Sequence, residues 1–381
     1  MRVVLFCHSL LSDYNHGNAH FLRGVVTELA ARGHEVSVYE PEDAWSVHCL
    51  VADRGEGPLA DVRRFYPAVR PIRYRADDLD LDRALDGASL VLVHEWSEPE
   101  LVRRIGEHRA RGGDALLFFH DTHHRSVTDP EAMGRYELGH YDAVLAFGRI
   151  IRDIYLARGW AKRAFVWHEA ADARVFSPRA VRPERDLVWI GNFGDEERTA
   201  ELEEFLLRPV RELGLSARVH GVRYPESARA ALSRSGIEYA GWLPNYLAPG
   251  AFARARVTVH VPRRPYASRL VGIPTIRPFE ALACGIPLVS APWEDAEGLF
   301  SPGRDYLVAR DGDEMKRHLR FLLDHPEAAA AMAARGRATI LARHTAAHRV
   351  DELLAIRETL EMERGRWHAA HSMETHVGNE P

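Results

Sequence analysis

Short apolar runs alternate along this chain with longer amphipathic stretches, and the alternation occurs twice. In the first half the apolar runs predict strands at residues 3–6, 34–39, 90–93, 115–119 and 143–147. Between the first two runs, Phe21, Val25 and Leu29 recur every four residues and predict an amphipathic helix over 19–32. Runs this continuously apolar are typical of a parallel sheet that is covered on both faces. The first half therefore predicts a doubly wound α/β domain.

The second half repeats the same scheme. Strands are predicted at 187–190, 217–220, 257–261 and 288–290, and helices near 199–213, 225–233 and 278–284. A proline-containing stretch between the halves predicts a hinge over 173–183. We expect domains over 1–172 and 184–344. A helix over 345–362 is expected to pack back on the first domain, and the polar tail, 363–381, is expected to be disordered.

Composition narrows the class of protein. A chain of 381 residues with 46% hydrophobic and 28% charged residues is typical of a globular protein with more than one domain. The apolar runs are too short to span a bilayer or to form a signal peptide, so neither membrane insertion nor secretion is indicated. The three widely spaced cysteines suit reduced thiols, and we expect a cytoplasmic protein. The formal charge of −5 predicts no nucleic-acid partner.

Histidines and carboxylates follow the predicted strands of the first half. Ligands bind at the carboxyl ends of strands in doubly wound sheets. His94 with Glu95, His120 with Asp121, and His16 in the loop before the first helix are therefore candidate catalytic groups, because a histidine oriented by a carboxylate is a common general base. A zinc site at His120 and the two histidines after it would lack a matching frame of ligands, so no metal site is predicted.

Arginines and small residues occupy the equivalent positions of the second half. Three spaced glycines after a strand would indicate a dinucleotide site, and neither half has them. Small loops and guanidinium groups instead suit a diphosphate. The candidates for this role are Gly191, Asn192, Arg198, Arg223, Arg263 and Arg264.

The segment 275–293 places Arg277 and Glu280 at the start of a predicted helix that ends at Gly285. Free N–H groups at a helix N-terminus with a cation beside them can bind phosphate, and a carboxylate there can accept hydrogen bonds from sugar hydroxyls. Helix chemistry alone allows a second interpretation, in which Arg277 and Glu280 form a local ion pair. The pattern does not separate the two.

Several motifs together resemble a known family. They are HEAADARVFSP (168–178), VWIGNFG (188–194), IEYAGWLP (237–244), VTVHVP (257–262) and IRPFEALACGIP (276–287). With these motifs the chain resembles the GT-B glycosyltransferases, specifically the CgeB-like group of the "glycosyl transferases group 1" domain. The resemblance implies two Rossmann-like domains facing a cleft, with the nucleotide-sugar donor on the second domain and a variable acceptor on the first.

The resemblance also assigns roles to residues. It implies that Glu280 binds the donor ribose, that Arg277 lies near the diphosphate, and that the base packs at Trp242 and Leu243. Many retaining relatives have a glutamate where this chain has Gly272, which leaves the stereochemistry open.

We expect metal-independent transfer of a sugar, of the hexosyltransferase type that the resemblance implies, from a nucleoside-diphosphate sugar, with no cofactor. The acceptor is a hydroxyl of a glycan, a lipid-linked molecule or a small molecule, with at most peripheral membrane contact. A sugar-nucleotide epimerase and a non-catalytic binding protein remain alternatives.

Overall fold

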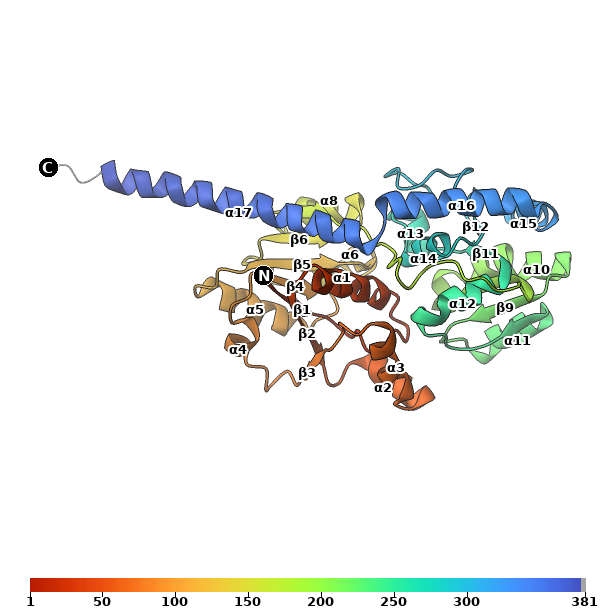
Figure 1. Ribbon diagram of the computed structural model, residues 1–381, viewed down its shortest axis with the longest axis horizontal. Coiled ribbons are helices and arrows are strands. Elements are labelled where there is room, and N and C mark those ends of the chain that lie inside the picture. The colour runs from red at the N-terminus through yellow and green to blue at the C-terminus, as the bar shows by residue number, and fades with distance from the viewer. Residues whose placement is uncertain (378–381) are drawn as a thin grey trace.

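The computed structural model describes the backbone of residues 1–377 and the side chains of residues 1–366 except Asp195. In this part of the chain, two parallel sheets form the centres of two lobes that meet at a junction near the middle of the molecule (Figure 1). Helices cover both sheets, so most strand residues are buried. The predicted pair of doubly wound sheets is confirmed.

The first lobe has the strand order β3-β2-β1-β4-β5-β6-β7, and neighbouring strands are parallel. The strands are β1 (Arg2–Phe6), β2 (Glu35–Pro41), β3 (Ile72–Tyr74), β4 (Leu90–His94), β5 (Leu116–Asp121), β6 (Ala143–Ala146) and β7 (Ala164–Val166). The apolar pattern predicted the central strands but not the two edge strands, β3 and β7. Both are short and incompletely buried, so their sequences carry no continuous apolar run.

Helices surround this first sheet. They are α1 (Ala19–Ala31), α2 (Trp45–Arg54), α3 (Gly57–Phe65), α4 (Leu81–Leu85), α5 (Pro99–Ala110), α6 (Arg125–Thr128), α7 (Pro130–Met133) and α8 (Arg149–Ala157). The predicted apolar face of α1 is buried, because Phe21, Val25 and Leu29 all lie in the core of the lobe. This packing fixes the loop before α1, residues 15–18, at the carboxyl end of β1.

The second lobe has the strand order β10-β9-β8-β11-β12-β13, again with parallel neighbours. The strands are β8 (Arg185–Ile190), β9 (Ala217–His220), β10 (Ile237–Tyr239), β11 (Ala255–His260), β12 (Leu288–Ser290) and β13 (Leu307–Val308). The helices are α9 (Thr199–Leu202), α10 (Arg208–Leu213), α11 (Glu226–Arg234), α12 (Ala248–Ala253), α13 (Arg264–Ser268), α14 (Ile276–Ala283), α15 (Gly312–Asp324) and α16 (Pro326–Arg343).

The helix predicted near 199–213 is not uniform. A π-helical turn, Glu203–Leu207, separates α9 from α10. Pro209 follows this turn and has no N–H group to donate to the carbonyl four residues before it. The wider turn accommodates the missing hydrogen bond.

The last helix, α17 (Ala346–Val377), returns to the first lobe and runs along it (Figure 1). It packs on α1 and buries Val350, Leu353 and Leu360, and the indole Nε1 of Trp167 donates to the carbonyl of Arg349 at 2.8 Å. Helix α17 continues to Val377, whereas the sequence predicted disorder over 363–381. The last part of that expectation, 378–381, lies outside the described residues.

Within residues 1–377, no helix is long and apolar enough to cross a membrane.

Candidate functional site

A cavity of about 580 Å³ lies between the two lobes, at the carboxyl ends of strands from both sheets. Its first-lobe wall comes from residues after β1, β4, β5, β6 and β7 and from the start of α2. Its second-lobe wall comes from residues at the ends of β8, β9 and β11 and from the start of α14. Parallel strands bring their carboxyl ends to one edge of each sheet, so two facing sheets produce one shared site.

The cavity gathers some of the predicted site residues and leaves out others. Those that line it are His16, Gly191, Asn192, Arg198, Arg223, Arg263 and Arg277. The predicted residues outside its lining are His94, Glu95, His120, Asp121, Trp242, Leu243, Arg264 and Glu280.

The predicted pairing of His120 with Asp121 is absent among the described side chains. Strand β5 continues to Asp121 and thus includes both residues, whereas the pattern placed them after the strand. Successive side chains of a strand point to opposite faces of the sheet. His120 packs against Phe21 and Trp167, and Asp121 accepts a hydrogen bond from the hydroxyl of Tyr155 at 2.9 Å. Neighbours in a strand cannot form the expected base and orienting pair.

His94 and Glu95 share Thr122 as a partner: its Oγ1 atom lies 3.3 Å from Nε2 of His94 and donates to Oε1 of Glu95 at 3.1 Å. Glu95 is buried and forms an ion pair with Arg125 at 2.8 Å, and it accepts a hydrogen bond from Thr122. The Nδ1 atom of His94 accepts a hydrogen bond from the backbone N–H of Trp96 at 3.3 Å. Thr122 thus connects the two residues, and no direct hydrogen bond between His94 and Glu95 is present among the described side chains.

Burial sets the protonation of these groups. It lowers the pKa of His120 to about 3 and holds that of His94 well below its usual value. Burial raises the pKa of Asp121 to about 8, against hydrogen bonds that lower it. The pKa of His16 is also held well below its usual value, first by burial and then by His8 and Arg23. At neutral pH these histidines are uncharged.

The arginines of the second lobe differ in what they can offer a ligand. Arg198 is partly buried, donates to the carbonyls of Asn192 and Val261, and lies over the ring of Trp189, so it shapes the wall. Burial lowers its pKa to about 9. Arg263 lines the cavity and pairs with Glu197.

Arg264 lies away from the cavity. It is half exposed and pairs with Glu201 at 2.9 Å. The guanidinium groups that face the cavity beside Arg198 are therefore those of Arg223, Arg263 and Arg277.

The side chains of Arg277 and Glu280 form an ion pair in the structure, which was one of the two interpretations of their spacing. Glu280 is fully buried, and its Oε1 atom lies 2.9 Å from Nδ1 of His20 in the first lobe. Because Nε2 of His20 accepts from the backbone N–H of Asp172 at 3.0 Å, Nδ1 carries the hydrogen that is donated to Glu280. Arg277 keeps a face toward the cavity, so it remains available to a ligand.

Trp242 forms a bridge between the lobes. Its Nε1 atom donates to Oδ1 of Asp13 at 3.1 Å, and the backbone N–H of Asn245 donates to Oδ2 at 3.0 Å. Asp13 is also held by Arg23 at 2.8 Å. Leu243 packs against the core nearby. The structure thus places the expected base-packing residues at a contact between the lobes.

Gly272 has a structural reason to be glycine. Its φ is +96°, a conformation that side-chain-bearing residues rarely adopt, and an added Cβ would lie 3.0 Å from the Cβ of Ala296. A glutamate at this position would be strained in this backbone conformation.

Sequence reasoning missed several residues of the cavity wall. Glu169 lines the cavity and accepts a hydrogen bond from Nδ2 of Asn18 at 2.8 Å. Trp45 and Trp96 also line it and are 45% and 42% exposed. Glu169 comes shortly after β7, the edge strand that the apolar pattern did not predict, so the rule about strand ends was never applied to it.

No group of three or more histidine, cysteine, aspartate or glutamate side chains is arranged to hold a metal ion in the described part of the chain.

Part of this chain matches a known family. Residues 198–355 match the family described as glycosyl transferase-like. No curated protein matches the chain.

Solved structures match nearly the whole chain. Sucrose-phosphate synthase from Thermosynechococcus elongatus has a TM-score of 0.66 and 14% identity over 95% of this chain and 100% of that chain. HepE of Anabaena, solved with UDP and glucose, has a TM-score of 0.63 and 12% identity over 94% and 100%. T4 phage BGT, solved with UDP and Mn²⁺, has a TM-score of 0.60 and 11% identity over 94% and 99%. At these identities the matches show the fold, and they confirm the predicted GT-B architecture.

Proposed function

Because this chain has a GT-B fold and its second lobe carries a glycosyl transferase-like domain, we propose that it transfers a sugar from a nucleoside-diphosphate sugar to a hydroxyl acceptor. The observation that carries the proposal is the cavity between the lobes, which has arginines on its second-lobe wall. Arg223, Arg263 and Arg277 all lie within the matched residues. A diphosphate carries the charge that such a wall would bind.

The diphosphate is proposed to lie at the start of α14. Thr275, Ile276 and Arg277 line the cavity there, and α14 has no side-chain cap among the described residues. Its first N–H groups can therefore donate to phosphate oxygens, and Arg277 adds a charge-assisted hydrogen bond. UDP-sugars are the first donors to test, because HepE and T4 phage BGT were solved with UDP.

The chemistry needs one bond to form and one to break. The acceptor oxygen bonds to the anomeric carbon, and the electron pair of the broken bond goes to the departing diphosphate. Arginines on the second-lobe wall offset the charge that grows on the diphosphate. We propose the domain division 1–172, 173–183 and 184–344, in which the first lobe presents the acceptor and closure excludes water.

A panel of UDP-, GDP-, ADP- and TDP-sugars tests the activity. Release of the nucleoside diphosphate together with a glycosylated acceptor supports the proposal. An altered sugar without release would indicate an epimerase, and thermal stabilisation without either product would indicate a binding protein.

Arg277→Ala tests the donor site. A hydrogen bond to a charged group contributes about 1.5–3 kcal/mol, so we expect the Kd for the donor to rise about 10- to 100-fold. Isothermal titration calorimetry with the donor identified in the panel measures the change.

Arg264→Ala is the matched control for that substitution, because Arg264 also pairs with a glutamate in the second lobe but lies outside the cavity lining. We expect its donor affinity to stay close to that of the wild type. Equal affinities for Arg277→Ala and the wild type would contradict the proposed diphosphate position.

A further inference from the structure

Glu169 is a buried carboxylate in the wall of the central cavity. It is only 5% exposed, and its Oε1 atom accepts a hydrogen bond from Nδ2 of Asn18 at 2.8 Å. Within the described residues its Oε2 atom has no hydrogen bond and no ion pair, and the side chain lines the cavity. One carboxylate oxygen is therefore available to a molecule in the cavity.

The segment that carries Glu169 is held from behind. The backbone carbonyl of Glu169 accepts a hydrogen bond from Nε of Arg349 in α17 at 3.3 Å. The side chain of the preceding residue, His168, pairs with Glu297 of the second lobe at 2.9 Å. These contacts fix the backbone on both sides of the carboxylate, so its side chain has a defined position relative to the cavity.

Other buried carboxylates of the described chain have more complete partners. Each is held by an arginine, by a histidine or by at least two hydrogen-bond donors, and none lines the cavity; they are Asp13, Glu40, Glu95, Asp121, Asp172, Glu280 and Asp305. Glu169 has a single neutral donor instead. A buried carboxylate without a cation beside it is costly to ionise, and such an arrangement in a cavity wall is typical of a functional group.

The surroundings of Glu169 favour proton uptake. Burial raises its pKa to about 8, against the hydrogen bond from Asn18, which lowers it. A base is most effective when its pKa lies near the pH at which it works. His16, the predicted histidine that lines the cavity, is a weaker base because burial and its charged neighbours hold its pKa well below the usual value.

We propose that Glu169 is the catalytic base that removes the proton of the acceptor hydroxyl. This proposal rests on the proposed glycosyl transfer. The proton passes to Oε2 of Glu169 while the acceptor oxygen bonds to the anomeric carbon. The bond between that carbon and the diphosphate oxygen breaks, and its electron pair leaves with the diphosphate. Asn18 is a positioning residue, since its hydrogen bond to Oε1 turns Oε2 toward the cavity.

Glu169→Gln tests the role directly. Glutamine keeps the shape of the side chain and can still accept from Asn18, but it cannot accept a proton. We expect kcat to fall about 10²- to 10⁴-fold, with the donor Kd within about twofold of the wild type. The wild-type kcat/KM should fall as the pH is lowered through about 8, and the variant should lack this dependence.

Asn18→Ala gives a second readout that a merely structural role would not produce. The hydrogen bond from Asn18 lowers the pKa of Glu169, so its removal should move the acidic limb of the pH profile to higher pH. Helix α1 should persist, because Asn18 makes no side-chain capping bond within the described residues.

The outcomes separate the two proposals. Transfer by the wild type with Glu169→Gln within tenfold of its kcat, or an unshifted acidic limb in Asn18→Ala, would overturn the role of Glu169 and leave glycosyl transfer intact. Absence of transfer by the wild type with every donor would overturn both. Thermal unfolding of each variant verifies that a loss of activity does not come from misfolding.

Discussion

A single buried histidine, His120, contributes to the pH dependence of the folding stability of this protein. His120 is enclosed by Phe21 and Trp167, and neither ring nitrogen has a hydrogen-bond partner among the described residues. Protonating the ring in the folded state would bury an unpaired charge. In the unfolded chain the same ring is solvated and titrates near its ordinary value. This difference links folding to pH.

We predict that His120→Phe makes the protein less sensitive to acid. The pKa of His120 is about 3 in the folded protein and about 6.5 when unfolded. The unfolded state therefore binds more protons as the pH falls below about 6.5, and stability is lost until about pH 3. Removing the ring should recover about 1.4 kcal/mol of unfolding free energy per pH unit in this window. Urea unfolding at pH 7, 6 and 5 measures the difference.

His140→Phe is the control, because His140 is exposed on the surface of the same lobe. Its stability should follow the wild-type pH dependence. A His120→Phe slope equal to that of the wild type would contradict the prediction. Because His120 is buried and does not line the cavity, we also expect this variant to keep its transfer activity.

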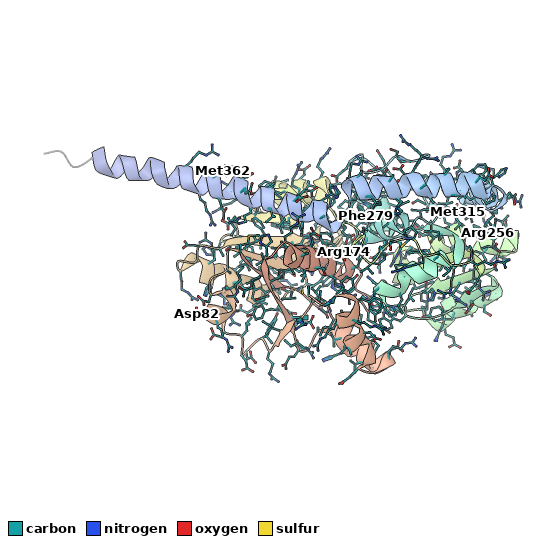
Figure 2. The ribbon with its side chains drawn as sticks, in the orientation of Figure 1. Asp82, Arg174, Arg256, Phe279, Met315 and Met362 are labelled. Atoms are coloured by element: carbon teal, nitrogen blue, oxygen red, sulfur yellow. The ribbon has the colours of Figure 1, made fainter. Side chains whose placement is uncertain are left out.

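At the scale of elements, α17 connects the second lobe to the first. Val350, Leu353 and Leu360 of this helix are buried, whereas Met362, labelled on the same helix in Figure 2, is 59% exposed. Arg349, near the start of α17, donates a hydrogen bond to the backbone carbonyl of Glu169. The helix therefore stabilises both the first lobe and one wall of the cavity.

We predict that Leu353→Ala destabilises the protein by about 2–5 kcal/mol, because it leaves a cavity under α17. Met362→Ala on the same helix should change the unfolding free energy by less than about 0.5 kcal/mol, since its side chain is on the surface. Chemical denaturation of the two variants measures the contrast. Similar losses for both would show that the packing of α17 on α1 contributes little.

The sequence predicted those elements whose residues are buried on both sides. Central strands such as β4 are apolar at nearly every position, so their pattern is visible locally. The edge strand β7 is only partly buried, and its absence from the prediction hid Glu169. In β5, a strand end misplaced by two residues turned two buried strand residues, His120 and Asp121, into an expected catalytic pair.

Contacts between the lobes could not be predicted from the sequence. His20 and Glu280 are fully buried partners that lie 260 positions apart in the chain. Arg174, at the junction of the lobes in Figure 2, binds Asp172 beside it. Such contacts depend on how two folded domains pack against each other. The local pattern of apolar and polar residues carries no information about that packing. The arginines after the second-lobe strands were easier to find, because the rule about strand ends applies within one domain.

At the scale of the whole molecule, Glu297 ties the second lobe to the first by two hydrogen bonds. One carboxylate oxygen accepts from the backbone N–H of Arg149, at the start of α8, at 2.6 Å, and the other accepts from His168 at 2.9 Å. An added Cβ at Gly148 would lie 2.4 Å from the side chain of Ile273, so the lobes approach closely here. Glu297 thus provides at this contact the capping group that α8 lacks within its own described residues.

We predict that Glu297→Ala weakens the contact between the lobes. Each hydrogen bond to a charged group contributes about 1.5–3 kcal/mol, and the substitution removes both of them. The lobes should separate more often, which would raise the radius of gyration in X-ray scattering and expose 173–183 to proteolysis. Glu238→Ala is the matched control, because Glu238 also binds two arginines but within one lobe. Scattering curves and cleavage rates that do not distinguish the two variants would show that Glu297 does not hold the lobes together.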